Sequence, residues 1–105
     1  MNTYEGLFIF PDAMTDVVLA DAVKRIQGEA GKLGGVILAA EILGRRTFAR
    51  RMQKQEAGQY VQMVFQLDPA QVTALRGRYR LSDEVFRVQI VRMPPQEVAI
   101  WKGRH

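Results

Sequence analysis

The chain has 105 residues and a mass of 11.9 kDa, which suffices for one hydrophobic core and is too short for two domains. Hydrophobic residues make up 48%, charged residues 25% and cysteine none, a composition that excludes a disordered chain, a disulfide framework and thiolate chemistry. The net charge of +4 is uneven, because residues 1–41 carry −3 and residues 42–105 carry +7; an arginine-rich excess of this kind favours a polyanionic partner.

The first predicted elements are a strand and a helix. Residues 3–10 are rich in aromatic and branched side chains and stop at Pro11, which predicts a strand followed by a turn. Thr15 is the predicted N-cap of a helix whose apolar residues recur with helical spacing through Leu33. Gly34 and Gly35 predict its end, since a left-handed residue commonly terminates a helix.

Residues 36–67 predict one long β-hairpin with a basic tip. The apolar run from Val36 to Leu43 is bounded by glycines and is short enough to be a strand, and Gly44 predicts a bulge. Strict alternation follows from Tyr60 to Leu67. It places Val61, Met63, Phe65 and Leu67 on one face and Tyr60, Gln62, Val64 and Gln66 on the other.

A second helix and a last strand complete the predicted domain. Asp68 as N-cap, Pro69 at the first helical position and Gln71 three residues after the cap predict a capping box. Residues 85–93 alternate again and stop at Pro94. We therefore expect one domain over residues 1–93 and a C-terminal tail over residues 94–105.

The order βαββαβ predicts an α+β, ferredoxin-like fold, with a four-stranded antiparallel sheet and two helices on one face. The predicted core comprises Phe8 or Leu7, with Leu19, Val23, Ile26, Val61, Met63, Phe65, Leu75, Phe86, Val88 and Ile90. The other face of the sheet is then left open. Its predicted side chains are Tyr60, Gln62, Val64, Gln66, Arg87, Gln89 and Val91.

Catalytic groups are not apparent in the sequence. The one histidine is His105 at the last position and the one serine is Ser82 in a turn, so no Ser-His-acid arrangement forms. Neither glycine-rich phosphate motif occurs. We expect no enzyme, no cofactor, no metal and no small-molecule substrate. The longest apolar run has five residues where a bilayer span needs about 20, so we expect a cytoplasmic protein without a membrane partner.

The basic tip of the hairpin is the candidate binding site. Arg45, Arg46, Arg50, Arg51 and Lys54 lie within ten residues, and phosphate binding requires such cationic density. Arg87 on the open face is a lesser candidate. Alternatively, the cluster is a solvated edge strand on which positive charge blocks edge-to-edge pairing.

Short motifs along the chain carry a family resemblance. They are Tyr4-Glu5, Gly44-Arg45-Arg46 with Phe48 and Ala49, Gly58-Gln59-Tyr60-Val61, and Asp83-x-Val85-x-Arg87. In this order they resemble the bacterial small-subunit ribosomal protein six family over residues 3–93. The resemblance implies a structural protein that binds small-subunit rRNA together with small-subunit ribosomal protein eighteen. Where the family usually has Leu-Ala-Tyr-Pro-Ile, this chain has Phe48-Ala49-Arg50-Arg51-Met52, so its hairpin is more cationic.

A protein partner is predicted from the side chains that the sheet and the tail leave uncovered. Tyr60, Val64 and Val91 on the open face and Trp101 in the tail are the predicted contacts, since aromatic side chains are enriched at interfaces. The resemblance implies that ribosomal protein eighteen is the partner. Alternatively, the tail folds back and Trp101 packs on its own domain. The rival function is a non-ribosomal ferredoxin-like protein-interaction or ligand-binding module that self-associates through its sheet face.

Overall fold

The computed structural model describes residues 1–52, 55–82, 85 and 87–104, without the side chains of residues 49–52, 55 and 56. Its elements, in chain order, are β1 (Asn2–Pro11), α1 (Asp16–Lys32), β2 (Val36–Met52), β3 (Gln55–Leu67), the 3₁₀ turn η1 (Pro69–Gln71), α2 (Val72–Arg80), β4 (Arg87–Met93) and α3 (Pro95–Arg104). The four strands form one antiparallel sheet in the order β2-β3-β1-β4. This confirms the predicted ferredoxin-like fold.

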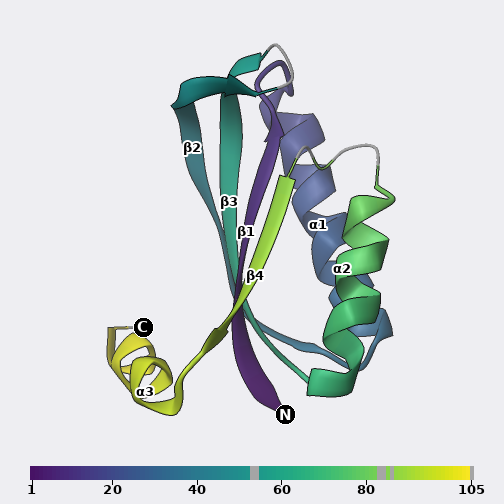
Figure 1. The fold of residues 1–105 in the computed structure, drawn as a ribbon, viewed down its shortest axis with the longest axis vertical. Helices are drawn as coiled ribbons and strands as arrows, with labels where there is room; N and C mark the ends of the chain where they lie inside the picture. Colours follow the sequence, from purple (N-terminus) through teal and green to yellow (C-terminus); the bar gives the residue numbers. More distant parts are fainter. Residues whose placement is uncertain (53–54, 83–84, 86, 105) are drawn as a thin grey trace.

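The two predicted helices, α1 and α2, cover one face of the sheet (Figure 1). Between them and the sheet lies a core that includes Phe8 rather than Leu7, with Leu19, Val23, Ile26, Val61, Met63, Phe65, Leu75 and Ile90. Val88 packs against this core while partly buried, and Phe86 lies outside the described residues. The predicted core is therefore confirmed wherever it is described, because alternation within each strand selected the correct face.

Capping residues fix where the helices begin and end. The Thr15 hydroxyl accepts from the Val18 backbone N–H at 3.4 Å, and Gly34 has the left-handed φ of 85° expected after α1. The Asp68 carboxylate accepts from the Ala70 N–H at 2.9 Å. The capping box is wrong, however, because the chain makes a 3₁₀ turn after Asp68 and α2 begins at Val72, with no capping bond from the Gln71 side chain.

The predicted β2–β3 hairpin is confirmed, and β2 bends near its carboxyl end (Figure 1). The pairing shifts between Ile37 and Ala39 and again between Ile42 and Gly44. Gly44 lies at the second shift and has a φ of 99°. A bulge residue can adopt this positive φ readily when it has no Cβ. The bulges let a 17-residue edge strand follow a more regular partner.

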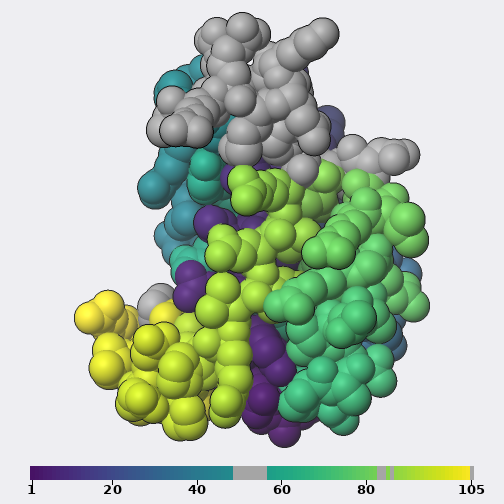
Figure 2. Space-filling view, viewed as in Figure 1, coloured from purple at the N-terminus to yellow at the C-terminus, as the bar shows by residue number. Residues whose placement is uncertain are grey.

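The segment predicted as a C-terminal tail contains a helix that the sequence analysis did not predict, α3, over Pro95–Arg104. α3 lies on the opposite side of the sheet from α1 and α2, beside the end of β4 (Figures 1 and 2). Its half-buried side chains Val98 and Trp101 are three residues apart, which places them on one face of the helix. Met93 is buried and lines small hollows with both of them. No helix among the described residues is long and apolar enough to cross a membrane.

Candidate nucleic-acid interface

A cluster of cationic and aromatic side chains lies on the open face of the sheet, at the hairpin end. The Arg46 guanidinium carbon lies 5.7 Å from the centroid of the Tyr60 ring, and the Phe48 and Tyr60 centroids are 6.3 Å apart. The strand register explains this arrangement, because Arg46 pairs with Gly58, two residues before Tyr60. Arg46 and Tyr60 therefore share a face. We call Arg46, Phe48 and Tyr60 the Tyr60 cluster.

Gly58 makes room for the Tyr60 cluster. A Cβ at this position would lie 2.6 Å from Ile9 Cγ2, 3.0 Å from Phe48 Cζ and 3.1 Å from the Phe10 carbonyl oxygen. These distances leave no room for a side chain, so only glycine lets Ile9 and the Phe48 ring approach β3 this closely at residue 58. The glycine of the Gly58-Gln59-Tyr60 sequence within β3 therefore has a steric role.

Arg45 points to the other face of β2, away from the Tyr60 cluster. Its Nε donates to the Asp12 carboxylate at 2.7 Å, and its side chain remains 57% exposed. Adjacent strand residues point to opposite faces, so Arg45 and Arg46 cannot act on the same surface. An exposed pair of this kind contributes about 0–1 kcal/mol. Its main effect is to tie the hairpin to the turn after β1.

The surface beside the Tyr60 cluster continues across three strands. Leu7 and Ile9 of β1, Tyr60 of β3, and Arg87 and Gln89 of β4 line a shallow hollow of about 230 Å³. The hollow brings a second arginine to the same face as Arg46. The hollow therefore has an apolar floor, the aromatic ring of Tyr60 and arginines at its rim. Such a surface can accommodate a base and its phosphate.

The predicted RNA-binding residues are therefore only partly brought together. Arg46 and Arg87 share the open face with Tyr60, whereas Arg45 lies on the other face. Arg50 and Arg51 lie on β2 with side chains that are not described, and Lys54 lies outside the described residues. These cations are close together along the chain, and the sequence analysis grouped them for that reason. In a strand, however, alternate side chains point to opposite faces, so neighbouring cations are divided between the two faces of the sheet.

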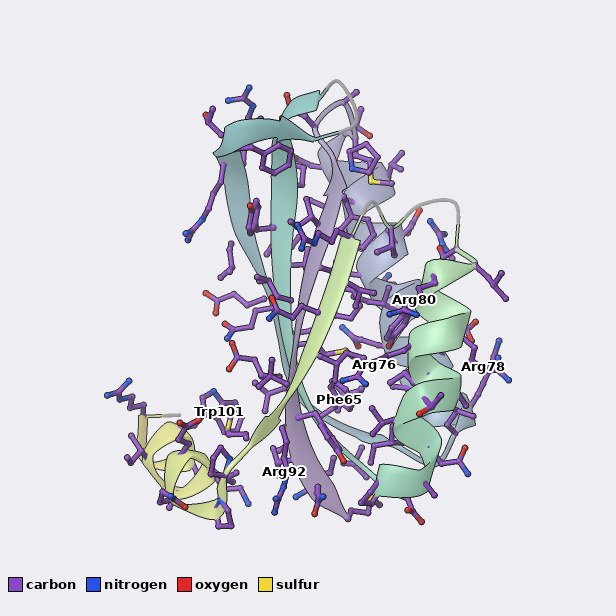
Figure 3. All side chains as sticks on the ribbon, viewed as in Figure 1. Phe65, Arg76, Arg78, Arg80, Arg92 and Trp101 are labelled. Carbon is purple, nitrogen blue, oxygen red and sulfur yellow. The ribbon has the colours of Figure 1, made fainter. Side chains whose placement is uncertain are left out.

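The predicted partner contacts differ in their exposure. Val91 is 52% exposed on the edge strand β4, while Tyr60 and Trp101 are half-buried. In Figure 3 the Trp101 side chain lies between α3 and the sheet. Val64 was predicted as a contact, and this is wrong because it is only 2% exposed. It lies on the predicted face, but β3 is an interior strand whose side chains have neighbours on both sides.

Sequence reasoning missed the arginines of α2. Arg76 donates to the Ile90 carbonyl at 2.9 Å and Arg78 donates to the Glu29 carboxylate at 2.8 Å. Figure 3 shows Arg78 on the side of α2 away from the sheet. The repeated arginines from residue 76 to residue 80 were a visible signal, since basic side chains favour the last turn of a helix. In the part of the chain that the structure describes, no group of three or more His, Cys, Asp or Glu side chains is placed to hold a metal ion.

Comparison with known proteins places the fold and these motifs in one family. The family model described as ribosomal protein S6 matches residues 3–92. The small ribosomal subunit protein bS6 of Porphyromonas gingivalis is 32% identical over 87 residues, covering 83% of this chain and 74% of that protein. The bS6 protein of Akkermansia muciniphila is 31% identical over 85 residues, covering 81% of this chain and 90% of that protein.

A solved structure agrees with both relatives. A crystal structure of 30S ribosomal protein S6 from Thermotoga maritima matches with a TM-score of 0.85 and 26% sequence identity. The match covers 99% of this chain and 98% of that one. The sequence match and the shared topology extend over nearly the same residues. The chain therefore belongs to the ribosomal protein S6 family, whose members are structural proteins of the small ribosomal subunit rather than enzymes.

Proposed function

We propose that this chain binds small-subunit rRNA through the Tyr60 cluster and Arg87 on the open face of its sheet. The observation that carries the proposal is the Arg46 guanidinium over the Tyr60 ring, next to Phe48. An arginine stacked on a ring keeps its N–H groups directed outward for phosphate oxygens, while the neighbouring ring offers a base a stacking partner. Membership of a cytoplasmic ribosomal family supports rRNA as the nucleic acid.

The remaining cations of the hairpin have a separate role in this proposal. Arg45, Arg50, Arg51 and Lys54 contact phosphates around the hairpin tip, without stacking. Phosphate contacts strengthen binding without reading sequence, and each one contributes to its salt dependence. Because Asp12 already pairs with Arg45, we expect Arg45 to contribute least among the described cations.

The partner in this proposal is ribosomal protein eighteen, bound at the β4 edge of the sheet. Among the residues that the structure describes, β1 is the one strand that pairs with β4, so the outer edge of β4 offers backbone groups. Val91 adds an exposed apolar side chain there. Trp101 on α3 lies at the same end and supplies an aromatic contact at the border of this surface. Val64 takes no part, since the chain itself buries it.

The experiment measures binding to a fragment of the rRNA central domain, with and without ribosomal protein eighteen, across a range of salt concentrations. Arg46→Ala should weaken binding about tenfold and should reduce the salt slope by roughly 0.7–0.9. Arg80→Ala is the matched control, because Arg80 is an exposed arginine on α2, on the opposite side of the sheet. Equal losses of RNA affinity in the two variants would contradict the proposed interface. Self-association of the chain without RNA binding would favour the alternative function, a non-ribosomal ferredoxin-like interaction module.

A further inference from the structure

The two edges of the sheet differ in how regular they are. β2 forms one edge and shifts register three times along its pairing with β3. Such bulges bend an edge strand and hinder the addition of a further strand. β4 forms the other edge, pairs with β1 without a shift from Arg87 to Met93, and contains neither proline nor glycine. Because native proteins cover or interrupt so regular an edge, a different feature is needed to close β4.

The Arg76 side chain covers the middle of this edge. From α2 it reaches β4, where its Nη2 donates at 2.9 Å to the carbonyl of Ile90, the central residue of the strand (Figure 3). A guanidinium carries several N–H donors, and a hydrogen bond from a charged donor is stronger than one between neutral groups. Arg76 therefore occupies the central acceptor of the edge.

The strand register shows that this carbonyl points outward, away from β1. Pro11 pairs with Gly58 and has no N–H, so these two residues form a pair that does not exchange hydrogen bonds. Alternation then turns the backbone groups of the even-numbered β1 residues, Gly6 included, toward β3. Gly6 lies opposite Ile90, so the N–H and C=O of Ile90 point away from β1. The outward-facing backbone groups of β4 belong to Val88, Ile90 and Arg92.

The sequence of β4 is complementary to itself in an antiparallel pair. A two-fold axis beside Ile90 would place Ile90 opposite its own copy and Gln89 opposite Val91. This pairing brings no two like charges directly opposite each other, and it packs the Gln89 stem against Val91, which is 52% exposed. The two Arg76 side chains, however, would both lie near the axis, since each contacts an Ile90 carbonyl. Their like charges repel, and the two carbonyls that the pair needs are already bonded.

We propose that Arg76 keeps the outer edge of β4 closed to a second copy of this chain. Its guanidinium bonds the acceptor at the centre of the edge and places a positive charge where the second copy would bring an identical one. A carbonyl can accept two hydrogen bonds, but the like charges still oppose the pair. The inference goes beyond rRNA binding and does not depend on it. A protein partner that adds a strand at this edge would first displace Arg76 from Ile90.

Sedimentation equilibrium of the full chain tests the proposal. Arg76→Met keeps a long side chain and removes its charge and its donors, so this variant should form dimers with a Kd of about 100 µM or tighter. The wild-type chain should remain monomeric at about 100 µM. Arg80→Met is the matched control, because it removes the same charge from an exposed position on the same helix, and it should remain monomeric. Arg76→Lys should also remain monomeric, since an ammonium group can donate to the same carbonyl.

Amide hydrogen exchange locates the contact. In the wild-type chain, the outward amides of Val88, Ile90 and Arg92 should exchange faster than the inward amides of Gln89 and Val91. In Arg76→Met the three outward amides should become protected as the protein concentration rises. Proline is tolerated where the N–H of an edge strand points outward, so adding Arg92→Pro to Arg76→Met should return the chain to the monomer.

The proposal is overturned if Arg76→Met stays monomeric at about 1 mM, if the Arg80→Met control dimerises equally, or if the new protection appears on β2 instead of β4. The wild-type exchange pattern tests the edge without any variant. Slow exchange at all three outward amides of the wild-type monomer would also overturn the proposal, because another group would then already pair with this edge.

Discussion

Gly58 is the position where a single methyl group should do most damage to the hairpin end of the sheet. In Gly58→Ala the new Cβ would lie 2.6 Å from Ile9 Cγ2 and 3.1 Å from the Phe10 carbonyl oxygen. Ordinary contacts begin near 3.4 Å, so β1 and β3 must separate by several tenths of an ångström. Overpacking of this kind typically costs about 1–3 kcal/mol. For a chain of this size, that corresponds to a fall in melting temperature of roughly 5–15 °C.

Thermal unfolding followed by circular dichroism measures this effect. Gly103→Ala is the control, because a Cβ at Gly103 meets nothing within 4 Å. Ile9→Ala removes the atom that collides, so the double variant should be less destabilised than the sum of the two single variants. A melting temperature of Gly58→Ala equal to that of the control would refute the steric reasoning. Purely additive losses would show that Ile9 is not the obstructing side chain.

The remaining predictions concern the core and the open face. Tyr79→Phe removes the hydroxyl bond to Ile26 and should cost about 1 kcal/mol of unfolding free energy at neutral pH. Because burial raises the pKa of Tyr79, the folded state favours the neutral phenol, and its stabilisation is present below about pH 10 and lost as the pH rises further. The difference between wild type and Tyr79→Phe in urea unfolding should therefore shrink above about pH 10; a difference that grew there would contradict the assigned shift. Val64→Ala should cost about 1–3 kcal/mol because Val64 is buried, whereas Val91→Ala should stay within about 0.5 kcal/mol. The reverse order would restore Val64 as a surface contact.

Local periodicity explains how much of the fold was predictable. Alternation along β3 and β4 and helical spacing along α1 and α2 depend on neighbours in the sequence, so these elements follow from local patterns. α3 was missed although its signals are equally local. Pro95 stands at its first position, Glu97 lies in its first turn, and Lys102 and Arg104 lie in its last turn. Two consecutive prolines predict the end of a strand, and in the structure the second of them also begins a helix.

The open face was predictable only where the strands are regular. Of the three register shifts along β2, the one between Ile37 and Ala39 reverses the alternation from Ala39 to Ile42, and the one between Ile42 and Gly44 restores it. If every second residue after Val36 lay on the same face as Val36, both Ile42 and Arg46 would lie on the open face. Because of the shifts, Arg46 lies there and Ile42 lies on the opposite face. Contacts between elements were beyond local patterns altogether. The pairs Arg45–Asp12 and Arg78–Glu29 join residues 33 and 49 positions apart, and only the packing of whole elements brings them together.

Ultraviolet crosslinking of small ribosomal subunits assembled with this chain tests the central claim most directly. A stacked aromatic side chain crosslinks to the base that it touches, so mass spectrometry of the digested protein locates the contact. The proposed interface predicts rRNA crosslinks at Phe48 or Tyr60, and their loss in Arg46→Ala subunits. Crosslinks confined to the α1 and α2 side of the molecule, with none on the open face of the sheet, would contradict it.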